Sequence, residues 1–131
     1  MSKYLHKKHF TLDEARKELT SVHALASKIV ELKASLNALG WNVNRHAYFG
    51  GMGPNGDGSF PPGMETLVDI VKGLEERGII VKGLDDGLID FPHVRSNGEE
   101  VYLCWKVGEN DISFWHSIPD GFQGRRHIDE L

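Results

Sequence analysis

The feature that most constrains the fold is an uninterrupted helical pattern over residues 11–39. This stretch contains neither glycine nor proline, and its apolar side chains recur in steps of three and four residues. They are Leu12, Ala15, Leu19, Val22, Ala26, Ile29 and Leu36, with Lys33 as the interruption. Such a spacing is typical of an amphipathic helix with a heptad seam, as in a coiled coil. At 1.5 Å per residue this helix would be about 43 Å long.

Both ends of this helix carry the residues that helix termini require. Thr11 followed by Glu14 is a capping box, which can satisfy backbone amides of the first turn. Gly40 can adopt the left-handed conformation that often follows the last helical residue. We therefore place the long helix at residues 10–40, after an N-terminal arm at residues 1–9. The arm has little apolar content, so we expect it to be partly ordered and not a targeting signal.

A second, shorter helix follows a segment rich in glycine and proline. Residues 41–63 cannot hold a regular element for long, and we expect a structured loop or a lid there. Gly78 ends the helical spacing that resumes with Leu67, Ile70, Val71 and Leu74. The second helix, at residues 64–78, would be about half as long as the first.

The unequal lengths of the two helices predict that something else covers part of the long seam. Packed as an antiparallel hairpin, the short helix covers only about half of it. Each leucine-class side chain left over would gain about 1.5 to 3 kcal/mol from burial. The cover could come from the glycine-rich loop, from the C-terminal sheet, or from the same helix of a second copy. We expect the last of these, a homodimer that assembles through its long helix.

After residue 78 the apolar period changes to two, which is typical of β-strands. Four segments show this period, at residues 79–82, 88–94, 101–106 and 111–116. The tripeptide Ser96-Asn97-Gly98 is a hairpin signal between the second and the third. The 131-residue chain is therefore predicted to be a single α+β domain, a helical hairpin followed by a small antiparallel β-meander and tail at residues 79–131.

Composition and charge disfavour several classes of function. The net charge of −4 argues against a general nucleic-acid binder, because an acidic surface repels phosphates. A single cysteine excludes an internal disulfide. No segment approaches the roughly 20 consecutive apolar residues of a membrane span. We therefore expect a cytoplasmic protein that binds neither nucleic acid nor membranes, and we predict no cofactor.

The segment LCWKVGENDISFWH, at residues 103–116, gathers a thiol, two indoles, two carboxylates and an imidazole. If a four-residue loop pairs Lys106 with Asp111, Cys104 and His116 point to opposite sides of the sheet. Shifting the register by one residue places them on one face but about 13 Å apart, whereas a thiolate and its base need about 3 Å. We therefore expect a structural cysteine. The HxxxH and HExxH spacings of zinc sites are absent, so no metal is predicted.

Asp90 stands between two apolar residues of a predicted strand. With a two-residue turn at Asn97-Gly98, it would face Trp105 on the apolar side of the sheet, where an unpaired carboxylate is costly. It therefore needs a cation or hydrogen-bond donors. We expect a bidentate ion pair with Arg125 or Arg126 of the tail.

The glycine-rich loop contains a literal GxGxxG match at Gly51, Gly53 and Gly56. A dinucleotide site needs these glycines to join a strand to the start of a helix, and Pro54 prevents a helix from starting there. We therefore do not expect a dinucleotide site. The aromatic and imidazole side chains around the loop could cover a ligand or pack against the helices, and we favour packing. They are His46, Tyr48, Phe49 and Phe60.

Several motifs resemble a known family. These are FTLDEA at 10–15, GLIDFP at 87–92, LCWKVGE at 103–109 and FWHSIPDGFQGR at 114–125. Together they resemble the signature of the uncharacterised prokaryotic proteins called domain of unknown function 2203. The resemblance implies helices followed by a small sheet, and it implies no activity. The residues that match the motifs are Asp90, Cys104, Trp105, Gly108, Glu109, Trp115, His116, Gly121, Phe122, Gly124 and Arg125.

These observations predict, first, a small assembly or binding module. The long helix would mediate self-association, and the sheet with its tail would present a polar patch to a small anionic ligand or a protein partner. Trp105, Glu109, His116 and Arg125 are the candidate ligand-binding residues, with the arginine suited to an anionic group.

The alternative is an enzyme of the hydrolase type. Asp90, Glu109 and His116 would act as acid and base groups in a cleft between the sheet and the loop. In this interpretation Asp90 has a raised pKa and lies near His116 or His93.

Overall fold

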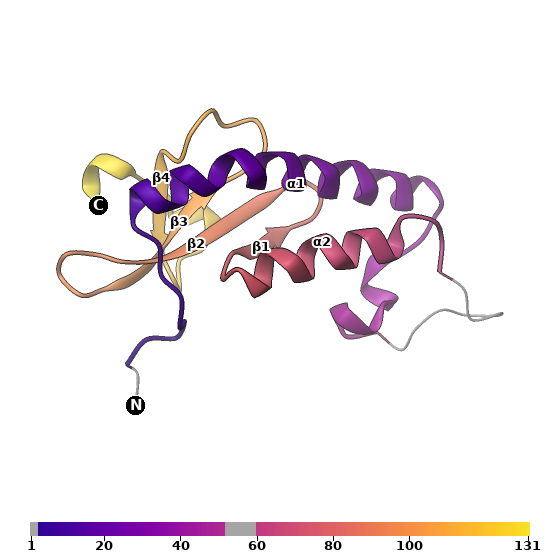
Figure 1. Cartoon of the computed structure of the whole chain (residues 1–131), viewed down its shortest axis with the longest axis horizontal. Coiled ribbons are helices and arrows are strands. Elements are labelled where there is room, and N and C mark those ends of the chain that lie inside the picture. Colours follow the sequence, from indigo (N-terminus) through magenta and orange to yellow (C-terminus); the bar gives the residue numbers. More distant parts are fainter. Residues whose placement is uncertain (1–2, 52–59) are drawn as a thin grey trace.

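The computed structural model describes residues 3–51 and 60–131. Within them, a long and a short helix are followed by a five-stranded antiparallel sheet, which confirms the α+β prediction (Figure 1). The helices are α1 (Leu12–Ala38) and α2 (Met64–Glu76). The strands are β1 (Ile80–Gly83), β2 (Leu88–Val94), β3 (Glu100–Trp105), β4 (Phe114–Ser117) and β5 (Arg126–His127), paired in that order. No helix in the described part of the chain is long and apolar enough to cross a bilayer.

The capping box at the start of α1 is present as predicted. The Thr11 side chain accepts a hydrogen bond from the Glu14 amide at 3.0 Å, and the Glu14 carboxylate accepts one from the Thr11 amide at 2.8 Å. At the other end Gly40 has a φ of 75°, the left-handed conformation that lets the chain turn away from the helix. The sequence signals therefore place both ends of α1 within two residues of their observed positions.

Five of the seven seam residues of α1 are buried within one copy of the chain, and the other two, Leu12 and Leu19, are partly buried. Ala15, Val22, Ala26, Ile29 and Leu36 are all 0% exposed. α2 runs back along α1, with Arg77 bonded to Glu18, and the sheet covers the rest (Figure 1). The expectation that the seam outruns its intramolecular cover is therefore wrong. Helical spacing shows which face is buried but not what buries it, and here the sheet supplies the missing cover.

The strand registers differ from the predicted ones by one residue. Asp90 pairs with Cys104 and not with Trp105, because residues 95–99 form a longer turn in which the Arg95 amide bonds to the Glu99 carbonyl at 2.8 Å. In the next hairpin Cys104 pairs with Phe114, whereas we expected Lys106 to pair with Asp111. The connection there is eight residues long, from 106 to 113.

Glu109 explains the long connection between β3 and β4. Its side chain accepts a hydrogen bond from the Lys106 amide at 3.0 Å, and its carbonyl accepts one from the Trp105 indole at 2.9 Å. The loop thus folds around its own glutamate and is held to the buried indole. These contacts stabilise a connection in which β4 begins only at Phe114, later than the alternating pattern indicates.

The corrected registers give the sheet two different faces. One face carries apolar residues that pack against α1 and the segment just before it, such as Trp105 beside His23 and Phe91 beside Phe10. Because side chains alternate along a strand, Asp90 and Cys104 point to the opposite face. That face is nonetheless buried at its centre.

The N-terminal arm is docked on the sheet. The Glu100 carboxylate accepts hydrogen bonds from the amides of Leu5 and His6 and contacts the His9 ring at 2.7 Å. The Phe10 amide donates to the Pro92 carbonyl at 2.7 Å. The described part of the arm is therefore tied to the outer ends of β2 and β3.

The side chains that flank the glycine-rich loop pack against the helices, as we favoured. The His46 ring stacks near Phe60 with a centroid distance of 4.7 Å and contacts Glu65 at 2.7 Å, and the Tyr48 hydroxyl donates to Glu75. Residues 52–59 of the loop, which include Gly53 and Gly56 of the GxGxxG match, lie outside the described residues.

Candidate functional site

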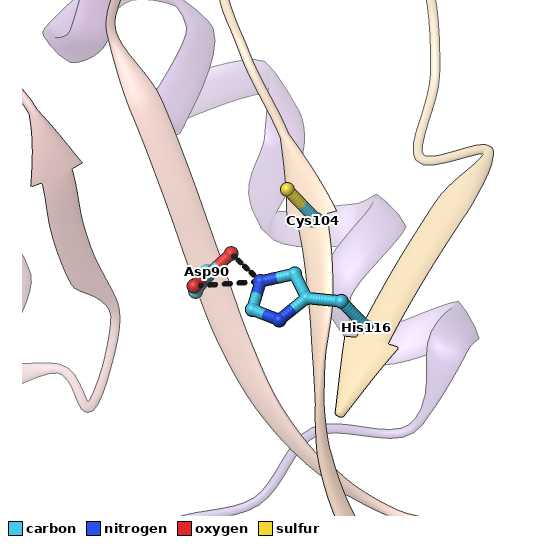
Figure 2. A group of neighbouring side chains, drawn as sticks. All are labelled: Asp90, Cys104 and His116. Atoms are coloured by element: carbon cyan, nitrogen blue, oxygen red, sulfur yellow. Dashed lines mark hydrogen bonds and ion pairs between the residues drawn. The ribbon is translucent and has the colours of Figure 1, made fainter. Parts of the chain in front are cut away.

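Asp90 and His116 form a buried pair on the face of the sheet away from α1. The His116 Nε2 atom lies 3.2 Å from Asp90 Oδ1 and 3.1 Å from Oδ2. Asp90 is 1% exposed and His116 is 3% exposed. Figure 2 shows the ring reaching across β3 from β4 toward the carboxylate on β2. The carboxylate that needed a partner has one, and that partner is a histidine.

The second ring nitrogen of His116 fixes its protonation. Nδ1 lies 2.8 Å from the carbonyl oxygen of Ser117, which can only accept, so Nδ1 carries a hydrogen. With Nε2 facing the carboxylate, the favoured state is an imidazolium that donates at both nitrogens. Burial alone would lower the pKa of His116, but the hydrogen bonds to Asp90 and Ser117 outweigh it and raise the pKa.

Cys104 completes the group from β3. It is 0% exposed, and its thiol lies within 4.8 Å of a carboxylate oxygen of Asp90. Burial and the negative charge of Asp90 raise the pKa of the thiol far above its ordinary value. The free protein therefore holds a protonated, shielded thiol, which is not an activated nucleophile. The expectation that Cys104 and His116 lie on opposite sides of the sheet is wrong, because the register places both beside Asp90.

Three chemically different donors thus converge from three adjacent strands. One ligand atom from each of Asp90, Cys104 and His116 lies within 4.8 Å of the other two, and all three residues are buried (Figure 2). A carboxylate oxygen, a sulfur and an imidazole nitrogen are the side-chain ligands that bind transition metals in proteins.

A second layer of side chains covers this cluster. The Tyr102 ring meets the His116 ring edge-on at a centroid distance of 5.5 Å, and the Lys82 ammonium lies 4.8 Å from the centre of the Tyr102 ring. The Tyr102 hydroxyl is 2.7 Å from His6 Nε2 of the arm. Burial, followed by the charges of Asp90 and Glu100, raises the pKa of Tyr102. Tyr102 therefore connects the described part of the N-terminal arm to the cluster.

Glu109 and Arg125 pair with each other beside the cluster. An Arg125 Nη2 hydrogen bond reaches Glu109 Oε1 at 2.8 Å, and the same atom lies 3.3 Å from the Cys104 carbonyl oxygen. The guanidinium group stacks on the rings of Phe114 and Phe122 at 4.1 and 4.7 Å. This pair fixes the β3–β4 loop and the tail against the strand that carries the thiol.

The structure separates the predicted site residues into distinct roles. Asp90 and His116 come together, as the acid–base hypothesis required, whereas Glu109 is directed to Arg125. Trp105, predicted to bind a ligand, is 0% exposed and lies on the helix-facing side.

The arginines predicted to pair with Asp90, and His93, contact other residues instead. The expected pairing with Arg125 or Arg126 is wrong, since Arg126 lies against Trp115 with 5.5 Å to the ring centre and Arg125 binds Glu109. His93, the other histidine considered, contacts the Phe10 carbonyl oxygen at 2.7 Å through Nδ1.

Comparisons with known proteins identify the family without assigning an activity. The family model described as "Uncharacterized conserved protein (DUF2203)" matches residues 8–128. No curated protein and no solved structure matches the chain significantly.

Proposed function

The chain belongs to the DUF2203 family of uncharacterized conserved proteins, and we propose that it binds a divalent transition-metal ion through Asp90, Cys104 and His116. The observation that carries this proposal is the convergence of the three donor atoms within 4.8 Å in a buried position. The proposal keeps the binding-module interpretation and gives it a ligand. The sequence has no zinc-type spacing, because the three donors come from three separate strands.

The spacing of the donors suits a first-row metal ion. Zinc bonds of about 2.0 to 2.3 Å to nitrogen, oxygen and sulfur place tetrahedral ligand atoms about 3.3 to 3.8 Å apart. His116 Nε2 and Asp90 Oδ2 are 3.1 Å apart, and Cys104 Sγ lies within 4.8 Å of a ligand atom of each residue. Small rotations of the side chains therefore suffice to bring all three donors to an ion.

The Ser117 carbonyl prepares His116 to be a ligand. Metal-binding histidines usually donate their other ring N–H to a carbonyl or carboxylate, which fixes the tautomer and the orientation of the ring. Nδ1 has that partner at 2.8 Å, so Nε2 is the nitrogen that would bind the ion. Nε2 is also the nitrogen that faces Asp90 and Cys104.

In the metal-free protein, protons occupy the place of the ion. His116 Nε2 and Cys104 Sγ both hold a proton whose loss is opposed by a raised pKa. A metal ion would displace these protons, so its affinity rises with pH and its binding releases protons. The thiolate and the imidazole favour zinc or cobalt over calcium or magnesium, which prefer oxygen ligands.

The two functions expected from the sequence have less support. The contact between Asp90 and His116 supports an acid–base hydrolase. However, Glu109 is bonded to Arg125, and the buried Asp90 and His116 side chains are almost inaccessible to a substrate. Self-association through the α1 seam has little support, because one copy buries five of the seven seam residues and partly buries Leu12 and Leu19.

Cobalt(II) spectroscopy tests the metal proposal. The reduced, metal-free protein titrated with Co²⁺ is expected to develop a thiolate-to-cobalt charge-transfer band that saturates at one ion per chain. Cys104→Ser should abolish this band, whereas His127→Gln, which changes an exposed histidine outside the cluster, should leave it unchanged. A wild-type protein that remains folded and gives no such band would refute the proposal.

A further inference from the structure

A shallow apolar groove lies between α1 and α2, away from the Asp90 cluster. Its volume is about 310 Å³, and its apolar lining comes from Leu25 on α1 and from Ile70 and Leu74 on α2. Asp69 and Arg77 also line it and carry opposite charges. The groove is thus mainly apolar and includes two unlike charges.

Gly73 marks the middle of this groove. Glycine inside a helix costs about 1 kcal/mol relative to alanine. Apart from its chain neighbours and the backbone of its own helix, no atom of residues 3–51 and 60–131 lies within 4 Å of the position that a Cβ at Gly73 would take, so the packing of these residues does not require glycine there. A helix from outside could approach the backbone closely at this point.

The charges on either side of Gly73 would pair with opposite charges on a second, antiparallel copy of α2. Asp69, Gly73 and Arg77 are spaced by four residues, so they form one ridge on the surface of α2. If two copies of α2 pack antiparallel about a two-fold axis at Gly73, Asp69 of each copy faces Arg77 of the other. Arg77 already binds Glu18 and Ser21, but both contacts use Nη2, and a guanidinium has five N–H donors.

We propose that the groove around Gly73 is the interface with a second copy of this chain. The pairing buries the apolar linings of both copies against each other and places two equivalent Asp69–Arg77 ion pairs at the edges. A self-complementary charge pattern favours a second copy over an unrelated partner, which would need no such symmetry. The α1 seam, which is largely buried within each copy, takes no part in this interface.

Sedimentation equilibrium with a charge-swap series tests the proposal. The wild-type chain is expected to be dimeric at micromolar concentration. Asp69→Arg places like charges opposite each other at both edges and should weaken association by at least about tenfold. Adding Arg77→Asp to the same chain restores unlike pairs across the axis, so the double variant should regain most of the lost association. Glu31→Arg, an equal charge reversal on α1 outside the groove, should have no effect.

Gly73→Gln separates loss of the interface from loss of the fold. The Cβ position at Gly73 is open among the described residues, and glutamine forms helices better than glycine, so thermal stability should be kept or raised while the longer side chain blocks close helix contact. We expect a stable monomer that still gives the cobalt band, so this test is independent of the metal proposal. A monomeric wild type across the micromolar range, or equal association of wild type and Asp69→Arg, would overturn the inference.

Discussion

The Asp90 carboxylate and the His116 ring meet across the central strand of the sheet, with His116 Nε2 3.1 Å from Asp90 Oδ2 although 26 residues separate them in the chain. Asp90 is on β2 and His116 is on β4, so their contact spans β3 and passes beside Cys104. The pair therefore joins three strands on one face of the sheet. Its stability depends on the relative positions of all three strands, and so does the geometry of the proposed metal site.

Substitutions in the pair should be strongly coupled. Removing one member of a buried ion pair leaves the other charge unpaired and typically costs about 3 to 5 kcal/mol. We expect Asp90→Asn and His116→Gln each to lower the free energy of unfolding by roughly that amount, and the double variant to cost less than the sum of the two. Urea unfolding of the metal-free proteins measures all three. Additive losses would show that the two side chains do not interact.

Stability should fall as the pH rises through the folded-state pKa of His116. This pKa is raised above the ordinary value of 6.5, because the bonds to Asp90 and Ser117 outweigh the effect of burial. The protonated ring is therefore favoured in the folded state. Its contribution is complete below the unfolded-state pKa and is lost as the pH rises through the raised value. Urea unfolding of the metal-free protein across this range should show the loss in the wild type and not in His116→Gln. An NMR titration that gives an unshifted or lowered pKa would contradict the assignment.

Cys104 should resist thiol reagents in the folded protein. Its thiol is 0% exposed, and burial together with the charge of Asp90 raises its pKa. Thiolate is the reactive form, so alkylation at neutral pH should be much slower in the native protein than in urea. Mass spectrometry of protein treated with iodoacetamide measures both rates. A native rate equal to the unfolded one would place the thiol in an open, reactive environment and contradict the buried cluster.

Acid should release the N-terminal arm from the sheet. Burial alone would raise the pKa of Glu100, but the hydrogen bonds from His9 and from the amides of His6 and Leu5 lower it. A lowered pKa means that the arm contact is complete above the unfolded-state value and is lost as the pH falls through the folded one.

Glu100→Gln provides the same release without acid. Hydrogen exchange of the Leu5 and His6 amides should accelerate in this variant, while Glu99→Gln, which changes the exposed neighbour, should leave exchange unchanged. Protection of both amides in Glu100→Gln would mean that other contacts hold the arm.

The sequence predicts the helices well because their signals are local. The spacing of apolar residues, the capping box at Thr11 and the glycine at residue 40 all act within a few positions, and α1 ends where they indicate. The burial of its seam by the sheet depends on tertiary packing, which no local pattern records. Hence the prediction of an uncovered seam failed although the helix itself was correct.

The candidate site was only half predictable, because strand register depends on loop length. The sequence identifies Asp90 as a buried carboxylate in need of a partner, and the acid–base alternative names His116 as its neighbour, which the structure bears out. The position of the Cys104 thiol beside Asp90 does not follow from the pattern, because the loops around residues 95–99 and 106–113 are longer than the shortest turns. The sequence does contain one signal for the observed strand register. Pairing the apolar residues Ile89 and Phe91 with Leu103 and Trp105 places Asp90 and Cys104 together on the opposite face of the sheet.

The proposed metal site is tested most directly by a calorimetric titration of the reduced, metal-free protein with Zn²⁺, repeated in two buffers that differ in ionisation enthalpy. We expect one ion bound per chain, a difference in heat between the buffers that reports protons released from His116 and Cys104, and loss of this binding in Cys104→Ser. Absence of binding by the folded wild type, or equal binding by Cys104→Ser, would contradict the proposed site.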